Sequence, residues 1–362
     1  MTYRYREIGK YLVCVDQPVS GALRNLVFGY EANKLSSLGV TPAVARNAIK
    51  VVVRAKLRSR YSNHYQPLSA FGQLGMQVHR GYKLFDFDGA RVTKIFAPGV
   101  SREEADQEIA ASKEAAIVSS APRFVAADPD STWFIEEYIK GTHATDLVSR
   151  NSSDYLRYYD DVEKCLLELL GCSVPLVIDA RAHISRLADD AWRDRWLNAG
   201  FSKEETDGIS DYIRQLSSEL VECMAGRQLQ LTRTHGDFSL VNAISTDNGL
   251  RIIDWEGIGP GSLFSDIYNF MFAERYYERS SADFSSEVQS IIEKFRDAVL
   301  KRYPALQQAA TMNQSMVRRL YYLERIRLMA NRDATPVLYR VIRKSIAMFT
   351  EFDHDAGDFS PY

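Results

Sequence analysis

The polar residues that could perform chemistry are concentrated in the segment THGDFSLVNAISTDNGLRIIDWEGIGPGSLFSD, which spans residues 234–266. Within it, His235, Asp237 and Asn242 follow the spacing H-x-D-x-x-x-x-N, and Asp254 comes after the apolar run 250–253. Transfer of a phosphoryl group to a hydroxyl group uses these residue types. One aspartate orients the hydroxyl and accepts its proton, while an asparagine and a second aspartate hold Mg²⁺ against the phosphates. The segment therefore predicts a phosphoryl-transfer site that holds Mg²⁺.

A short strand and a tight turn are expected to bring these residues together. The run 250–253 is typical of a strand, and Asn248-Gly249 favours a tight turn before it. The two polar clusters then lie at the ends of adjacent chain segments and can converge on one site. The tripeptide His-Gly-Asp by itself is also compatible with a plain turn whose acids cap a helix.

The motif resembles the catalytic loop H-G-D-x-x-x-x-N of kinase-like phosphotransferases in the aminoglycoside phosphotransferase and choline kinase group. In this resemblance Asp237 is the catalytic base, and Asn242 and Asp254 are the ligands of Mg²⁺. His235 belongs to the catalytic loop, where it orders the chain rather than reacting. Asp266 matches an aspartate that braces the loop in the family.

The resemblance covers roughly residues 70–300 and implies a fold of the α+β class. That fold is bilobal and protein-kinase-like, with a small β-rich N-lobe and a larger, mostly helical C-lobe. We expect an N-terminal extension of unknown role over residues 1–65 and a nucleotide-binding lobe over 66–140. The C-lobe, with the catalytic loop and the metal site, is expected over 141–362.

The nucleotide lobe is expected to contain a lysine and a glutamate that pair. Strands are predicted over 82–86 and 91–96, because Asp88-Gly89 between them favours a hairpin turn. Lys94 on the second strand matches the family lysine that contacts the α- and β-phosphates. A capping box from Ser101 to Glu104 opens a helix to about residue 118, and Glu108 on it matches the partner of that lysine. Glu114 and Lys83 remain alternatives for the two positions.

Two other stretches are candidates for nucleotide contacts. Gly72 and Gly75, with Gly81 later, are compatible with a loop over the phosphates, since glycine lets backbone N–H groups approach an anion, but also with hairpin turns. The strand-like run 133–139 resembles the last strand of the small lobe and the hinge to the large one. The resemblance assigns the adenine to main-chain groups there, with these candidates: Glu137, Tyr138 and Ile139.

Residues after the hinge are predicted to be mainly helical. Helices are expected over 154–170, from the capping box at Ser202 to about residue 224, and over 284–302, 314–331 and 336–350, before a loose acidic tail over 351–358. Four tyrosines in this part are compatible with a core or with a substrate wall: Tyr276, Tyr277, Tyr321 and Tyr322.

Composition restricts the class of protein. The chain has 362 residues, of which 46% are hydrophobic and 25% charged, and this favours ordinary globular units over disorder. A net charge of -2 argues against a protein that binds nucleic acid over its whole surface, while local basic patches remain an alternative. No window approaches a membrane span, and the start lacks an apolar leader, so we expect a cytoplasmic protein. Four scattered cysteines are expected to be reduced and mostly in the core: Cys14, Cys165, Cys172 and Cys223.

A basic amphipathic helix is predicted near residues 42–60, with a strand as the alternative because of the valine run 51–53. Arg46, Lys50, Arg54 and Arg58 recur at every fourth residue opposite an apolar face. The basic stripe is compatible with a solvated face or with a weak contact to a membrane surface or an acidic partner.

The expected activity is transfer of the ATP γ-phosphoryl group to a hydroxyl of a small molecule, such as an amino sugar, a sugar or an amino alcohol. No A-P-E sequence follows Asp254, which disfavours a protein-kinase activation segment of the usual kind. A lipid or glycolipid kinase, an atypical protein kinase and a nucleotide-binding pseudokinase remain alternatives. The acceptor, the choice between ATP and GTP and the oligomeric state are left open by the sequence.

Overall fold

Two compact units divide the chain in the computed structural model, which describes residues 3–8, 11–14, 16, 66–68, 70–78 and 80–355. The first unit contains Met1–Leu147 and Leu240–Glu256, and the second contains Val148–Ser239 and Gly257–Tyr362. The segment 234–266 therefore contributes to both units. The first unit is rich in strands and the second in helices, which confirms the predicted α+β class.

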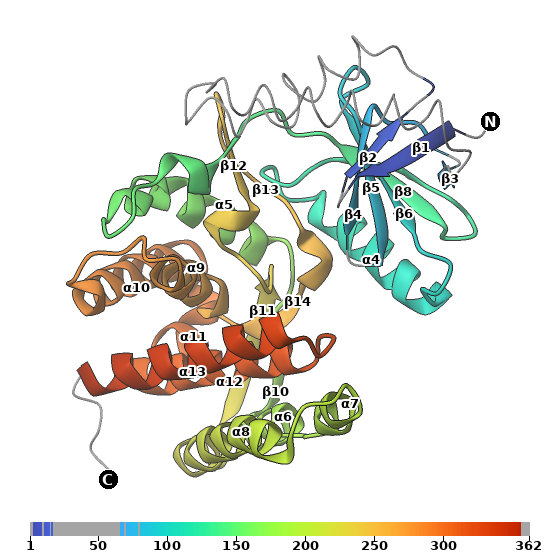
Figure 1. Cartoon of the computed structure of the whole chain (residues 1–362). Coiled ribbons are helices and arrows are strands. Elements are labelled where there is room, and N and C mark those ends of the chain that lie inside the picture. The colour runs from blue at the N-terminus through green and yellow to red at the C-terminus, as the bar shows by residue number, and fades with distance from the viewer. Residues whose placement is uncertain are drawn as a thin grey trace. The chain divides into compact units, whose positions relative to one another are not determined.

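An eight-stranded antiparallel sheet forms the first unit, in the order β3-β1-β2-β4-β5-β6-β8-β7 (Figure 1). Its strands are β1 (Tyr3–Ile8), β2 (Tyr11–Cys14), β3 (Gln66–Leu68), β4 (Leu74–Val78), β5 (Gly81–Asp86), β6 (Arg91–Phe96), β7 (Phe124–Ala127) and β8 (Trp133–Glu137). The two predicted strands and the hairpin turn between them are present as β5 and β6. Alternation of apolar residues along the strands places Tyr5, Leu12 and Leu84 in one buried cluster.

The first strands do not form a separate extension. β2 pairs with β4, and Leu12 lies opposite Gly75 in that pairing, so β1 and β2 belong to the same sheet as the expected nucleotide-binding strands. The boundary expected near residue 65 therefore does not separate two units. No local pattern indicates this pairing, because sheet pairing joins segments that are far apart in the chain.

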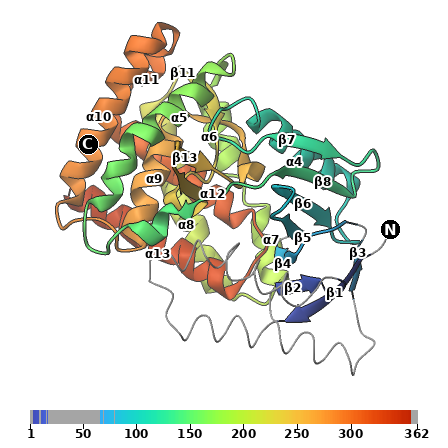
Figure 2. The same cartoon turned by 90° about the horizontal axis from the view of Figure 1, so that it is seen from above.

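The helix α4 (Arg102–Ala115) lies against this sheet (Figures 1 and 2). Its predicted capping box is present, since the Ser101 side chain accepts from the Glu104 N–H and the Glu104 carboxylate accepts from the Ser101 N–H. Ile109 packs against Phe96 and Phe134 of the sheet. This buried face of α4 also carries Glu108.

A second sheet of the first unit contains the predicted strand after the catalytic motif. Its order is β13-β12-β9, with β9 (Thr142–His143), β12 (Ala243–Thr246) and β13 (Gly249–Ile252). The expected turn at Asn248-Gly249 joins β12 to β13. A 3₁₀ turn, η4 (Leu240–Asn242), leads into β12, and another, η5 (Trp255–Gly257), follows Asp254.

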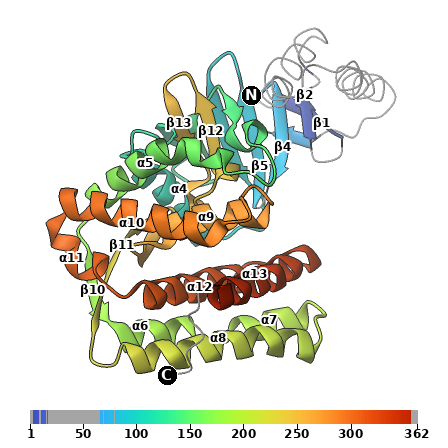
Figure 3. The same ribbon diagram turned by 90° about the vertical axis from the view of Figure 1, so that its left-hand side faces the viewer.

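The second unit combines a three-stranded sheet with helices (Figure 3). The sheet has the order β10-β11-β14, with β10 (Leu176–Asp179), β11 (Gln228–Thr234) and β14 (Gly259–Ser262). The longer helices are α5 (Tyr159–Gly171), α6 (Ala180–Leu187), α7 (Trp192–Asn198), α8 (Lys203–Cys223), α9 (Ser265–Tyr276), α10 (Phe284–Arg302), α12 (Gln314–Ala330) and α13 (Pro336–Asp355). Short helical turns are η2 (Ala144–Leu147, in the first unit), η3 (Asp154–Tyr158), η6 (Pro304–Leu306) and α11 (Gln307–Ala310). The helix α12 packs against α8, α9 and α13.

Aromatic side chains fill the contact between α9, α12 and α13. The Tyr322 and Phe349 rings stack with their centroids 4.1 Å apart, and Phe272 meets Phe349 edge to face at 5.2 Å. Tyr322 is therefore a core residue, whereas Tyr277 is 42% exposed. Tyr321 is buried beside Tyr322, with ring centroids 5.8 Å apart, and it also lines a cavity of the second unit.

Three expectations need correction or restriction, and they concern the C-terminal tail, the cysteines and the basic stripe. The helix α13 continues to Asp355, so residues 351–355 are helical rather than part of a loose tail. Cys14 and Cys165 are buried, but Cys172 and Cys223 are exposed, and none of the four forms a disulfide bond. The basic stripe predicted over residues 42–60 lies outside the described residues. Within the described part of the chain, no helix combines the length and hydropathy that a bilayer crossing requires.

Candidate active site

The loop that carries Asp237 begins where β11 ends at Thr234, in the second unit. Asp266, at the start of α9, accepts the His235 N–H at 2.6 Å and the Gly236 N–H at 3.1 Å. Gly236 has a φ of +83°, and a Cβ there would lie 2.6 Å from the Gly257 carbonyl oxygen, so glycine is required. Asp266 therefore occupies the bracing position that the sequence predicted.

His235 is fully buried, and its Nδ1 accepts the Asp237 N–H at 3.2 Å. Its ring meets Phe238 edge to face, and the Asn269 amide donates to the Phe238 carbonyl at 2.8 Å. A histidine in this position holds the shape of the loop.

Asp237 lies between two arginines of the second unit. Arg325 contacts its Oδ1 at 2.8 Å and Arg332 its Oδ2 at 3.4 Å, while the Asp237 side chain stays 30% exposed. Burial raises the pKa of Asp237, but the two arginines outweigh burial and hold this pKa at about 2. The carboxylate is therefore ionised at neutral pH and can accept a proton.

Burial has the opposite outcome at Asp266. It raises the pKa of Asp266 to about 7, although the two N–H donors act to lower it. Since the pKa in the folded protein exceeds the ordinary value of 3.8, the stabilisation is complete below about pH 4 and is lost as pH rises through 7.

We expect Asp266→Asn to destabilise the protein by about 1–3 kcal/mol at pH 5. Both oxygens of the protonated carboxyl can still accept an N–H, whereas an amide offers one oxygen and its NH₂ faces a donor. Urea unfolding measures the difference between wild type and variant. The difference should be larger at pH 5 than at pH 8. A variant as stable as wild type at pH 5 would show that Asp266 does not brace the loop.

The expected ion pair of the first unit is present. Lys94 Nζ lies 2.9 Å from Glu108 Oε1, and the side chains are only 4% and 6% exposed. Glu108, rather than Glu114, is thus the helix residue that meets this lysine.

A second lysine lies beside the first. Lys83 on β5 is opposite Lys94 on β6 in the antiparallel register, so both side chains are on one face of the sheet. Lys83 Nζ contacts Asp254 Oδ1 at 2.6 Å, with 20% of the lysine and 45% of the aspartate side chain exposed. Burial lowers the pKa of Lys83, but Asp254 and Glu136 outweigh burial, so its pKa is raised and the lysine is charged. The contact was missed because residues 83 and 254 are remote in sequence.

Asn242 and Asp254 are brought together by the β12–β13 hairpin. The Ile253 N–H donates to the Asn242 carbonyl at 2.9 Å, and Asp254 follows with a φ of +61°, which is uncommon for a residue with a side chain. An amide and a half-exposed carboxylate supply the hard oxygen atoms that Mg²⁺ prefers when phosphates and waters complete its coordination. The donor set therefore fits Mg²⁺. No group of three or more acidic, histidine or cysteine side chains in the described residues suggests a metal site made by the protein alone.

The two candidate glycines are packed inside the sheet. The Gly72 N–H donates to the Tyr5 hydroxyl at 2.8 Å, and a Cβ on Gly75 would lie 2.7 Å from Leu84 Cδ2. Close packing of strands explains both glycines without a contact to phosphates.

The hinge candidates follow β8. The Glu137 N–H donates to the Arg123 carbonyl and the Tyr138 N–H to the Ala90 carbonyl, both at 2.9 Å. Of the three candidates, Ile139 is therefore the one whose N–H stays a candidate for the adenine contact.

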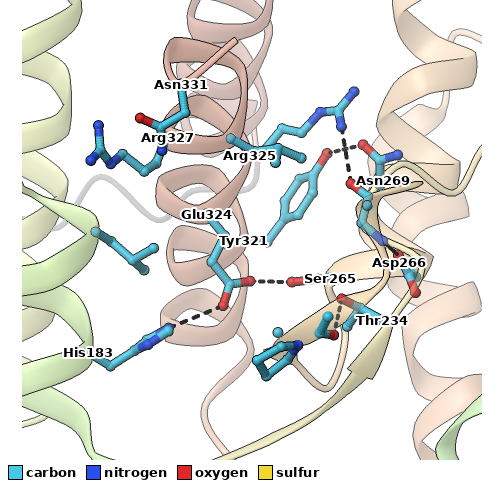
Figure 4. Close-up of a pocket in the computed structure, with 17 residues that line it drawn as sticks. His183, Thr234, Ser265, Asp266, Asn269, Tyr321, Glu324, Arg325, Arg327 and Asn331 are labelled. Atoms are coloured by element: carbon cyan, nitrogen blue, oxygen red, sulfur yellow. Dashed lines mark hydrogen bonds and ion pairs between the residues drawn. The ribbon is translucent and has the colours of Figure 1, made fainter. Parts of the chain in front are cut away.

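A cavity of about 240 Å³ adjoins the catalytic loop in the second unit (Figure 4). Gly236, Asp266 and Arg325 line it, together with residues of α6, β14, α9 and α12. In the first unit a cavity of about 30 Å³ is lined by Lys83, Glu108, Glu136 and Asp254, among others.

Residues 79–310 match the family described as the phosphotransferase enzyme family, APH, which is more than half of the chain. The chain belongs to this family. As a member, it is a kinase-like phosphotransferase with an alcohol group as acceptor. No curated protein sequence is significantly similar to it.

Solved structures with a similar fold include other phosphotransferases. A choline kinase from Cryptosporidium parvum shows 14% identity over 80% of this chain and 88% of its own, with a TM-score of 0.48. For an aminoglycoside phosphotransferase from Streptomyces rimosus, bound to ADP and streptomycin, the values are 16%, 70%, 92% and 0.43. For an ethanolamine kinase from Plasmodium vivax they are 12%, 76%, 81% and 0.45. At this similarity, what these proteins bind says nothing about the acceptor of the present phosphotransferase.

Proposed function

We propose that this phosphotransferase moves the γ-phosphoryl group of ATP, in the presence of Mg²⁺, to a hydroxyl group of a small molecule. The observation that carries the proposal is the placement of Lys83 and Lys94 on one face of the sheet, with Asp254 in contact with Lys83. Two adjacent lysines provide the positive charge that a triphosphate requires. A sugar, an amino sugar or an amino alcohol is the small acceptor expected from the sequence.

The proposed step is an in-line displacement. The acceptor oxygen attacks the γ-phosphorus, the bond from that phosphorus to the β–γ bridging oxygen breaks, and the proton of the acceptor hydroxyl passes to the Asp237 carboxylate. ADP and a phosphorylated acceptor leave. His235 and Asp266 keep the loop in shape, so they are positioning residues.

Asn242 and Asp254 would hold the metal, and Mg²⁺ when bound would neutralise charge that develops on the phosphates. Lys94, fixed by Glu108, and Lys83 would contact the phosphates, while the Ile139 main chain would contact the adenine. A cytoplasmic location, where ATP and reduced thiols occur together, belongs to the same proposal.

The two lysines can be separated by their partners. Lys83→Ala is expected to lower kcat/KM for ATP by about tenfold or more with little change in stability, because Lys83 is part exposed and Asp254 stays solvated. Lys94→Ala is expected to lower kcat/KM for ATP too, and in addition to lower the free energy of unfolding by about 3–5 kcal/mol, because it leaves buried Glu108 unpaired. Steady-state kinetics and urea unfolding measure both effects.

Lys94→Met combined with Glu108→Gln removes both charges and limits the loss of stability, so its kinetics report the phosphate contact. Lys164→Ala, on an exposed position of α5, is the control. An unchanged kcat/KM for ATP in Lys83→Ala would remove Lys83 from the site.

ATP consumption against a panel of amino sugars, amino alcohols, sugars and lipid precursors tests the function. Turnover that requires one small hydroxyl compound supports it. Label transfer only to protein would indicate a protein kinase, and transfer only to a lipid a lipid kinase. ATP binding without turnover on the whole panel would indicate a pseudokinase and contradict the proposal.

A further inference from the structure

The cavity beside the catalytic loop lies where an acceptor hydroxyl could reach Asp237. Gly236 of the loop lines the cavity, and so does Arg325, whose guanidinium contacts both Asp237 at 2.8 Å and the Gly236 carbonyl at 3.4 Å. The remaining walls are helices and β14 of the same unit. The charges of the lining residues therefore indicate what kind of acceptor the cavity admits.

Glu324 on α12 is the lining carboxylate that could attract a cationic acceptor. Its oxygens already accept the Ser262 N–H at 3.1 Å and the Ser262 hydroxyl at 2.8 Å. They also accept the Ser265 hydroxyl, and His183 lies 3.5 Å away (Figure 4). A carboxylate accepts about four hydrogen bonds. Glu324 is thus occupied by the protein and gives little to an ammonium group.

Asp266 is occupied as well, since each of its oxygens accepts a backbone N–H of the catalytic loop. Neither lining carboxylate is therefore placed to bind a cation without breaking contacts that hold the second unit together.

Arg327, in contrast to the two carboxylates, has few contacts that compensate its charge. Its side chain is only 11% exposed, and its buried Nη1 has no hydrogen-bond partner within the described part of the chain. The carboxylate that its Nη2 approaches, Asp189, is 3.8 Å away and 58% exposed, which makes a weak pair. Burial lowers the pKa of Arg327, in keeping with a charge that the protein compensates poorly. A poorly paired guanidinium in the wall of a cavity is available to an anionic ligand.

We propose that the cavity binds the acceptor and that Arg327 holds an anionic group on it, a carboxylate or a phosphate. The proposal rests on the proposed function, and it replaces the expected amino group of the acceptor by a negative one. Guanidinium groups bind such oxyanions through two parallel hydrogen bonds. Figure 4 shows Arg325 and Arg327 leaving α12 in opposite directions, so the reacting hydroxyl near Asp237 and the anionic group lie at different ends of the acceptor.

Binding is tested without catalysis by thermal unfolding in the presence of gluconate or inorganic phosphate. Either anion should raise the Tm of the parent protein, and Arg327→Gln should lose most of that shift. Arg327→Lys, which keeps the charge without the fork, should retain part of it. Arg340→Gln, on an exposed position of α13, is the control and should behave as the parent. An equal shift in the parent and in Arg327→Gln would overturn the assignment of Arg327.

Turnover is tested with acceptors that share a carbon skeleton and differ in charge: gluconate, glucose 6-phosphate, glucose and glucosamine. We expect phosphorylation of one of the two anions, and which one it is distinguishes a carboxylate from a phosphate. Arg327→Gln should raise KM for that anion by about 10- to 100-fold and change kcat much less, because the lost contact is remote from the reacting hydroxyl.

Phosphorylation of glucose or glucosamine, with neither anion accepted, would overturn this inference and leave the proposed function intact. Absence of any ATP turnover would instead count against the proposed function. In that case the Tm shifts still decide whether Arg327 binds anions.

Discussion

Asp237→Asn is expected to lower kcat by about 10²- to 10⁴-fold while Mg-ATP binds with nearly the wild-type affinity. An amide cannot take the proton of the acceptor hydroxyl, and loss of general-base help typically has this size. The nucleotide contacts proposed above are elsewhere, on Lys83, Lys94 and Asp254. Single-turnover rates and an ATP titration measure the two quantities separately.

Two controls accompany this test of Asp237. Arg325 and Arg332 lose a charged partner in the variant, so urea unfolding must accompany the kinetics to exclude a folding defect. Asp211→Asn on α8, where the side chain is 67% exposed, is the matched control and should match wild type in both assays. A kcat within about threefold of wild type in Asp237→Asn would remove Asp237 as the base.

The pKa of Asp237 adds an expectation for pH. Because this pKa is about 2, the base is ionised across the range in which the protein is ordinarily assayed. At saturating substrate concentrations, kcat should therefore not fall between pH 8 and pH 5 through protonation of Asp237. The stability that Asp237 contributes through its pairs with the arginines is present above about pH 4 and is lost as pH falls through 2.

Asp254→Asn is expected to have a different signature, a loss of the metal-dependent part of ATP affinity together with turnover. A neutral amide replaces a charged oxygen ligand, so Mg²⁺ should be held less tightly and the gain in ATP affinity on adding Mg²⁺ should fall by about tenfold or more. ATP titrations with and without Mg²⁺ measure this gain directly and need no turnover.

The control for Asp254 lies on the same hairpin. Asp247→Asn changes an exposed turn residue by the same chemistry and should leave the Mg²⁺ effect unchanged. Asp254→Asn also frees Lys83, so Lys83→Ala serves as a second reference. If Asp254→Asn kept the full metal effect while Asp237→Asn lost it, the two proposed roles would have to be exchanged.

Local signals in the sequence were sufficient for much of the frame. The capping box at Ser101, the hairpin turns at Asp88-Gly89 and Asn248-Gly249, and the alternation of apolar residues in β5 and β6 act between neighbours in the chain. Such preferences do not need tertiary contacts to be expressed. The motif around Asp237 likewise carries its spacing in the sequence, and residues 79–310 match the phosphotransferase family.

Tertiary structure decided which distant segments pair and which charged side chains meet. Pairing of β2 with β4 joined the first residues to the main sheet, and packing used Gly72 and Gly75 for close contact between strands rather than for a loop. Contacts between sequence-distant residues placed Lys83 beside Asp254, and Arg325 and Arg332 beside Asp237.

The same distinction applies to the candidate acceptor cavity. The sequence by itself determined the type of chemistry, because phosphoryl transfer needs few residue types at a fixed spacing. The charge offered to the acceptor was decided by the tertiary structure, because serine hydroxyls from β14 and α9 occupy Glu324 while Arg327 on the same helix is left with a buried, unpartnered N–H within the described residues. Whether a charged side chain has hydrogen-bond partners depends on neighbours that lie far apart in the chain. The helical spacing of Glu324 and Arg327 alone does not distinguish between the two side chains in this respect.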